Sequence, residues 1–141
     1  MEKNNKSVRF SLVKISTDQF AIITNSFKIG EAVNLKTGLQ FGADKENKIL
    51  SVKASFQFEQ QAIPFLVIEA SCFFKIEPND WNTFAEEREI VVPKGIITHF
   101  TVLTVGTVRG ILHAKTEGTN FNGFVIPTID VTKLVTSDIR M

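Results

Sequence analysis

Apolar and polar residues alternate along the first half of the chain in a pattern that predicts β-strands. In residues 50–58, apolar side chains occupy every even position, with Ser, Lys and Gln between them. Residues 33–41 and 66–76 show the same period with a more mixed second face. Short polar connections separate these segments, so we expect an antiparallel meander with one face on a core.

The segment before this meander has a less regular pattern. Residues 8–15 alternate well enough to predict a first strand. Residues 16–32 break the alternation but remain rich in apolar side chains. We expect a long crossover loop here, and loops of this length often have a function.

The second half of the chain has a different, helical pattern. Residues 94–115 follow Pro93 and are apolar without alternation, which predicts one long helix that ends before Gly118. Asp130 is expected to cap a short last helix that runs to Leu134. With residues 1–7 as a loose polar tail and residues 77–92 irregular, the sequence predicts a single α+β domain over residues 8–136.

The predicted long helix is apolar on nearly every side, and such a helix is normally buried on both sides. One four-stranded sheet covers only one side, and two or three valine-sized side chains left in water forgo about 1.5–3 kcal/mol each. We therefore expect a second subunit to cover the other side, unless the apolar loop at residues 16–32 folds over it. A row of small residues at i, i+4 spacing marks the expected interface: Thr98, Val102, Gly106, Gly110 and Ala114.

Composition narrows the possible partners and compartment. The chain has 141 residues, of which 43% are hydrophobic, and its formal net charge of +1 argues against nucleic acid or an anionic membrane surface. Its single cysteine excludes an internal disulfide and fits a reducing compartment. No signal sequence and no membrane-spanning run are recognised, so we expect a cytoplasmic protein without membrane insertion.

The residues that usually perform catalysis form no pattern that predicts an active site. His99 and His113 are too far apart along the helix to share a metal, which requires i, i+4 spacing. Cys72 falls on the apolar face of a strand, where a thiol is desolvated and unreactive. Gly106 and Gly110 lie inside a helix and therefore form no phosphate-binding loop. We expect a protein that is not an enzyme and needs no cofactor or metal.

The functional signal is apolar. The chain has 13 Phe and no Tyr, so its aromatic surface fills cores or grooves without hydrogen-bonding a ligand. If the connections before the second strand and after the long helix border the same edge of the sheet, they frame a hydrophobic groove that suits extended, unfolded polypeptide. The alternative is that these residues simply close the core. The candidate groove residues are Phe20, Ile22, Phe27, Ile29, Phe121, Phe124 and Ile126.

From about residue 10 to residue 134, the order of the predicted elements resembles that of the SecB family of export chaperones. The most specific likeness is TEGTNFNGFVIPTIDV, residues 116–131, which is similar to the family's segment after the long helix. Arg109 resembles the arginine inside that helix, and FLVIEASCFFKI, residues 65–76, resembles the family's last strand.

This resemblance implies an architecture and a mode of action. The long helix and a short C-terminal helix would pack on one face of a four-stranded antiparallel sheet with a long crossover after the first strand. Two subunits would join their sheets edge to edge, and two such dimers would pack through their long helices into a homotetramer. The crossover and the loop after the helix would line a groove for non-native polypeptide clients, without ATP or metal.

Typical members of the family pass precursors to the SecA motor, and this chain departs from them in ways that bear on that step. They are strongly acidic and dock SecA on an acidic sheet face, whereas the predicted wet face here has Lys36, Lys53 and Lys75, with Glu69 as its main acid. The longer final helix and tail are not found after Leu134. Chaperoning is therefore better supported than delivery to SecA.

We expect an ATP-independent chaperone (holdase) that binds unfolded or precursor polypeptides in a hydrophobic groove, in protein export. Two alternatives remain open on the sequence. One is a dedicated SecB-like chaperone of a single partner, such as an antitoxin. The other is a carrier of apolar small molecules.

Overall fold

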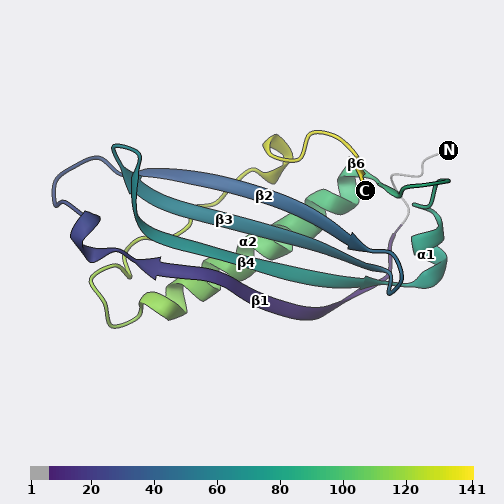
Figure 1. Cartoon of the computed structure of the whole chain (residues 1–141), viewed down its shortest axis with the longest axis horizontal. Coiled ribbons are helices and arrows are strands. Elements are labelled where there is room, and N and C mark those ends of the chain that lie inside the picture. Colours follow the sequence, from purple (N-terminus) through teal and green to yellow (C-terminus); the bar gives the residue numbers. More distant parts are fainter. Residues whose placement is uncertain (1–6) are drawn as a thin grey trace.

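The computed structural model describes residues 7–141 and consists of an antiparallel sheet with a long helix across one face (Figure 1). The strands of the sheet are β1 (Phe10–Ile22), β2 (Asn34–Asp44), β3 (Ile49–Gln60) and β4 (Ile63–Ile76), in the spatial order β1-β4-β3-β2. The other elements are η2 (Thr24–Ser26), α1 (Pro78–Asn82), β5 (Val91–Val92), α2 (Lys94–Thr116), η3 (Val131–Lys133) and β6 (Ile139–Arg140). The predicted α+β fold class is confirmed. Of the predicted tail at residues 1–7, only Ser7 belongs to the described residues.

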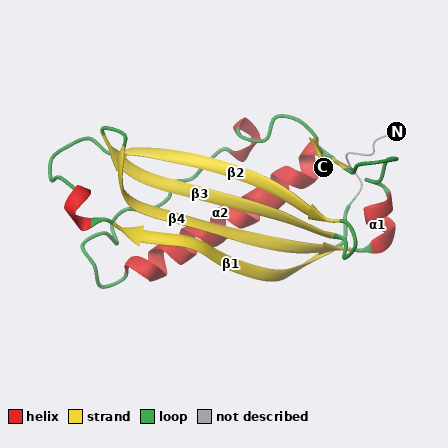
Figure 2. Ribbon diagram, in the orientation of Figure 1, coloured by secondary structure: helices red, strands yellow, loops and turns green. Residues whose placement is uncertain are grey.

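The core lies between the sheet and α2, which crosses the sheet obliquely (Figure 2). In β3 every even-numbered residue is buried, as the alternating pattern predicts. Phe74 of β4 stacks on Phe100 of α2 with ring centroids 4.2 Å apart. Cys72 lies in the same core and is 1% exposed. The helix predicted at residues 94–115 is confirmed, and Gly118 just beyond it has a left-handed φ of +79°.

The first strand is longer than predicted, and this corrects the expected loop at residues 16–32. β1 continues to Ile22 and pairs with β4 along its whole length. Its register shifts between Leu12 and Lys14 and again between Thr17 and Gln19. Each shift adds one unpaired residue, which breaks the period of two in the sequence although the strand continues. The crossover is therefore confined to residues 23–33.

Residues 77–92, expected to be irregular, contain a short helix and a short strand. Pro78 begins α1, and the side chain of Glu77 caps it by accepting a hydrogen bond from the Asn79 N–H. The predicted cap at Asp130 is present, but the element that it begins is a single 3-10 turn. The fold also extends past residue 136, because β6 pairs with β5.

The outer side of α2 has no cover within the described chain. The small-residue row lies on this side: Val102 is 50% exposed, and a Cβ added at Gly106 or Gly110 would meet no atom within 4 Å. The crossover packs at the end of the sheet instead of over this side, so the intramolecular alternative is not observed. The helix side that the sequence predicts to be unpartnered remains so in the single chain.

The length and composition of α2 also meet the criteria for a membrane span. Its most apolar window has a mean hydropathy of 1.4. By length and composition α2 could therefore span a membrane, and the expectation that the chain contains no such segment is wrong in this respect. In the fold, however, one side of α2 packs against β3 and β4. A helix that covers a sheet in a globular domain has the same composition, so this likeness to a span is weak evidence for one.

Candidate polypeptide-binding surface

Five phenylalanines gather at the end of the sheet where β1 enters the crossover and α2 ends. They are Phe27, Phe58, Phe65, Phe121 and Phe124, and we call them the aromatic cluster. Phe65 is at its centre and is 0% exposed. Its ring centroid lies 4.8 Å from that of Phe27 and 5.1 Å from that of Phe124. The cluster thus joins the crossover, the sheet and the loop that follows α2.

A buried glutamine fastens the crossover to the sheet. Gln60, the last residue of β3, donates from Nε2 to the carbonyl oxygens of Lys28 (2.7 Å) and Glu31 (3.3 Å). Its Oε1 accepts a hydrogen bond from the Lys28 N–H at 2.9 Å. The Ile23 N–H also donates to the carbonyl of Phe65 at 2.7 Å. These bonds fix the crossover backbone over the cluster.

The loop after α2 is fastened to the helix by an arginine and an asparagine. Arg109 donates from Nε to the carbonyl of Ile126 and from a terminal guanidinium nitrogen to that of Pro127, each at 2.7 Å. Asn122 Nδ2 donates to the carbonyl of His113 and to Thr116 Oγ1, each at 3.1 Å. The loop that contributes Phe121 and Phe124 is therefore held in place by polar contacts from its own helix.

Gln60→Leu should free the crossover while changing little else. Leucine has a similar volume but leaves the Lys28 N–H and two carbonyls, all part-buried, without their partner, and each lost hydrogen bond costs about 1 kcal/mol. We expect hydrogen exchange at the Lys28 amide to accelerate by at least tenfold. As a control, Gln57→Leu on the outer face of β3 should leave that rate unchanged. Equal hydrogen-exchange rates at the Lys28 amide in the wild type and in Gln60→Leu would contradict the role of Gln60 in holding the crossover.

Exposed apolar side chains lie on or next to the segments that contribute the aromatic cluster. They come from the crossover, from the first residue of β4 and from the loop after α2, which lie at the same end of the molecule (Figure 1). Ile29 is the most exposed of them, at 93%. The members are Ile23, Ile29, Val33, Ile63 and Val125. We call this rim, together with the cluster beneath it, the apolar end surface.

The structure divides the predicted groove residues between the floor and the rim of this surface. Phe121 and Ile126 are buried and support it from below, and Phe27 and Phe124 are half-buried within the cluster. Ile29 belongs to the rim. Phe20 and Ile22, expected in a loop, instead lie half-buried in β1 and pack against the same core. The sequence reasoning missed Ile63, whose place beside Pro64 at a turn was the available signal.

The outer face of the sheet bears the charges that the sequence predicts for it. Lys36 and Lys53 project from β2 and β3, and Lys75 and Glu69 from β4, opposite the face covered by α2. Lys14 of β1 adds a further positive charge, with its Nζ 5.3 Å from the centre of the Phe73 ring. Asp18, which accepts a hydrogen bond from Ser71, and Glu59 of β3 add acids, so this face is mixed in charge. The described residues contain no group of three or more His, Cys, Asp or Glu side chains placed to hold a metal ion.

No protein-family model and no curated protein matches this chain. Solved structures that are similar to it include the following two. One is the SecB-like chaperone Rv1957 of Mycobacterium tuberculosis in complex with a ChAD peptide from the antitoxin Rv1956 HigA1. The two sequences are 12% identical, and the match covers 88% of this chain and 90% of that chain with a TM-score of 0.45. The other is a protein of unknown function from Streptococcus agalactiae. It is 13% identical in sequence, and the match covers 89% of this chain and 100% of that chain with a TM-score of 0.44.

Proposed function

We propose that this protein is an ATP-independent chaperone, a holdase, that binds non-native polypeptide on the apolar end surface. The observation that supports the proposal is an exposed apolar rim above an aromatic cluster whose two connecting loops are fastened by Gln60, Arg109 and Asn122. A rim of aliphatic side chains attracts apolar segments in proportion to the area buried and without regard to their order. That property suits many unfolded clients better than one small ligand.

The wider role that we propose follows the sequence resemblance. The protein would act in the cytoplasm on precursor polypeptides during export, without catalysis, ATP, metal or cofactor. A reducing compartment agrees with the single buried thiol of Cys72. Delivery to SecA has less support, because Lys36, Lys53 and Lys75 make the outer sheet face unlike an acidic docking surface.

The proposal is tested by aggregation of a destabilised client. Stoichiometric amounts of the wild-type chain should slow aggregation measured by light scattering, without added nucleotide. The double variant Ile29→Ser, Ile63→Ser removes two exposed isoleucines from the rim, so its affinity for a labelled unfolded client should fall by about tenfold or more. Leu134→Ser is the matched control, since Leu134 is also exposed but lies outside the apolar end surface.

A wild-type chain that leaves aggregation unchanged at stoichiometric ratios would overturn the holdase. Equal losses in the double variant and in Leu134→Ser would instead show that binding does not use the apolar end surface. Saturable binding of one partner, with no effect on general clients, would indicate a dedicated chaperone.

We also propose that the outer side of α2 is an interface between copies of this chain, in a dimer of dimers. Val102 and Leu103 are exposed there, and Gly106 and Gly110 leave open space in which a second backbone could approach. The charge of the chain is near neutral, so like-charge repulsion does not oppose such an assembly.

A further inference from the structure

The last residues of the chain lie across the end of the molecule opposite to the apolar end surface (Figure 1). β6 pairs with β5 in antiparallel register, Val91 opposite Arg140 and Val92 opposite Ile139. The Ile90 N–H donates to the carbonyl of Met141 at 2.8 Å, and the Met141 N–H donates back to the carbonyl of Ile90 at 3.0 Å. We call residues 138–141 the strap, and the surface beneath them the dock.

The first residue of the strap caps the amino end of α2. Asp138 Oδ1 accepts a hydrogen bond at 2.8 Å from the N–H of Lys94, which is the first residue of α2. The residue that precedes the helix, Pro93, gives it no side-chain cap. The amino end of a helix carries partial positive charge, so this position favours a carboxylate.

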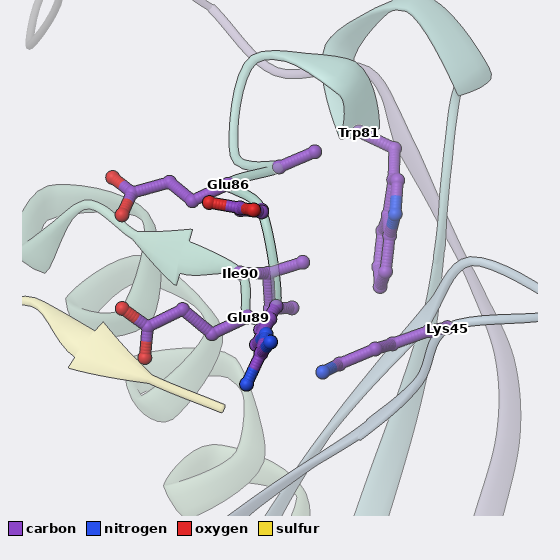
Figure 3. A pocket seen from close by; sticks show the side chains of 8 residues that line it. Lys45, Trp81, Glu86, Glu89 and Ile90 are labelled. Atoms are coloured by element: carbon purple, nitrogen blue, oxygen red, sulfur yellow. The ribbon is translucent and has the colours of Figure 1, made fainter.

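The following residues alternate between the core and a pair of acids. Ile139 and Met141 pack against the core cluster to which Ile90 and Val92 belong. Between them, Arg140 points outward and forms ion pairs with Glu89 and Glu86. In Figure 3 these two glutamates extend away from Lys45 and Trp81, on the side of the hairpin along which β6 runs.

The dock is built without the strap. The Val91 N–H donates to the carbonyl of Phe84 at 2.9 Å, and Ala85 pairs with Ile90, so the hairpin that ends in β5 is held from its other side. Trp81 and Phe84, both buried, form part of the core beneath this hairpin. The pocket beside the hairpin, of about 260 Å³, is lined by Lys45, Trp81 and residues 85–90. Neither the Val91–Phe84 hydrogen bond nor the Ala85–Ile90 pairing involves the strap.

The strap is a short element whose connection to the rest of the chain is exposed. β6 is a strand of two residues, and strands this short add little stability by themselves. Residues 136 and 137, which connect it to the buried Val135, are exposed. Short, exposed segments of this kind open at the low end of the range of local unfolding free energies. Opening would uncover the Ile90 N–H and C=O, the Lys94 N–H and an apolar strip.

We propose that the dock is a peptide-binding site that this chain fills with its own strap. Its ligand class is an extended peptide with the order acid, apolar, basic, apolar, added as a strand to β5. The acid would bind at the amino end of α2, the apolar residues would enter the core, and the basic residue would pair with Glu86 and Glu89. This site is separate from the apolar end surface and does not depend on the proposed function.

Hydrogen exchange on the unmodified full-length chain tests this proposal. The probe is a synthetic peptide of residues 136–141 with both ends blocked, added in large excess. When it replaces the strap, the Ile90 amide keeps a partner, whereas the Met141 amide of the chain loses its own. We therefore expect exchange at Met141 to accelerate by at least threefold while Ile90 stays protected. If hydrogen exchange at Met141 stays unchanged at peptide concentrations up to millimolar, the peptide does not displace the strap and the proposal is wrong.

A strap-disabled full-length variant gives the complementary measurement. Ile139→Asp places a charge against the core, so its strap should leave the dock open. The labelled peptide should bind this variant at least tenfold more tightly than it binds the wild type, whose strap competes at high effective concentration. A peptide with Asp replaced by Asn, and one of scrambled order, should both bind more weakly. Equal binding of the scrambled peptide, or no preference for the variant over the wild type, would contradict the proposal.

Discussion

Phe65→Ala should lower the free energy of unfolding by about 3–5 kcal/mol, the usual cost of truncating a buried phenylalanine. Phe65 is fully buried, and its ring contacts the four other rings of the aromatic cluster, Phe27, Phe58, Phe121 and Phe124. The cavity would lie between two loops and the sheet, so both loops should also lose protection from hydrogen exchange. Denaturant unfolding followed by far-UV circular dichroism measures the first effect.

The matched control is Phe73→Ala, which removes the same side chain from the same strand. Phe73 is half-buried on the outer face of β4, where Lys14 lies over its ring. Its loss should cost about 1 kcal/mol, because little core is opened and an exposed cation–π contact is worth only about 0.5–1 kcal/mol. Similar losses for the two variants would mean that the aromatic cluster is not a packed part of the core.

Gly106→Leu should dissociate the proposed assembly without weakening the subunit. A side chain at this position meets open space in the single chain, but it would fill the gap into which a second backbone is proposed to pack. Replacing a mid-helix glycine by leucine also favours the helix by about 0.8 kcal/mol. We therefore expect the solution mass, measured by light scattering, to fall at least twofold while the stability of the monomer is kept or raised.

Gly123→Leu serves as the control for this substitution. Gly123 lies in the loop after α2, away from the small-residue row, and an added Cβ there also meets no atom within 4 Å. Its mass should equal that of the wild type. A wild-type chain that is already monomeric at micromolar concentration, or a Gly106→Leu variant of unchanged mass, would refute the interface.

The sequence predicted those elements whose pattern is regular. The alternation in β3 and the long, largely apolar segment of α2 that lacks alternation appear in the structure where the residues indicate them. The prediction was wrong where an inserted residue interrupts the pattern. In β1, unpaired residues at Val13 and Asp18 break the alternation, and the second half of the strand therefore resembles a loop.

A register shift also explains why the sequence did not predict Phe65 as the centre of the aromatic cluster. Counting by twos from Leu66 places Phe65 on the outer face of β4. In the structure, the register shifts next to Phe58, and Phe65 has no partner on β3. Phe65 and Leu66 are both fully buried in the same cluster, because a bulge turns two successive side chains toward one face. Sequence periodicity alone gives no position for such a bulge.

The hydrophobic pattern also could not predict which apolar side chains of the two connections are exposed. Ile29 and Ile126 are the same residue type in the two apolar connections, yet one is nearly fully exposed and the other is buried beneath the loop. The difference depends on hydrogen bonds over long sequence distances, such as those of Gln60 with Lys28 and of Arg109 with Ile126. The strap was missed because two residues are too few to show a period.

The position of Cys72 gives this chain an internal chemical probe. It is the sole thiol of the sequence, and it lies in a central strand between Ile15 of β1 and Val52 of β3. A thiol-specific reagent must reach the thiolate, and here it reaches it only when the sheet and α2 separate. The labelling rate under native conditions therefore measures how often the core around this strand opens, without any introduced label.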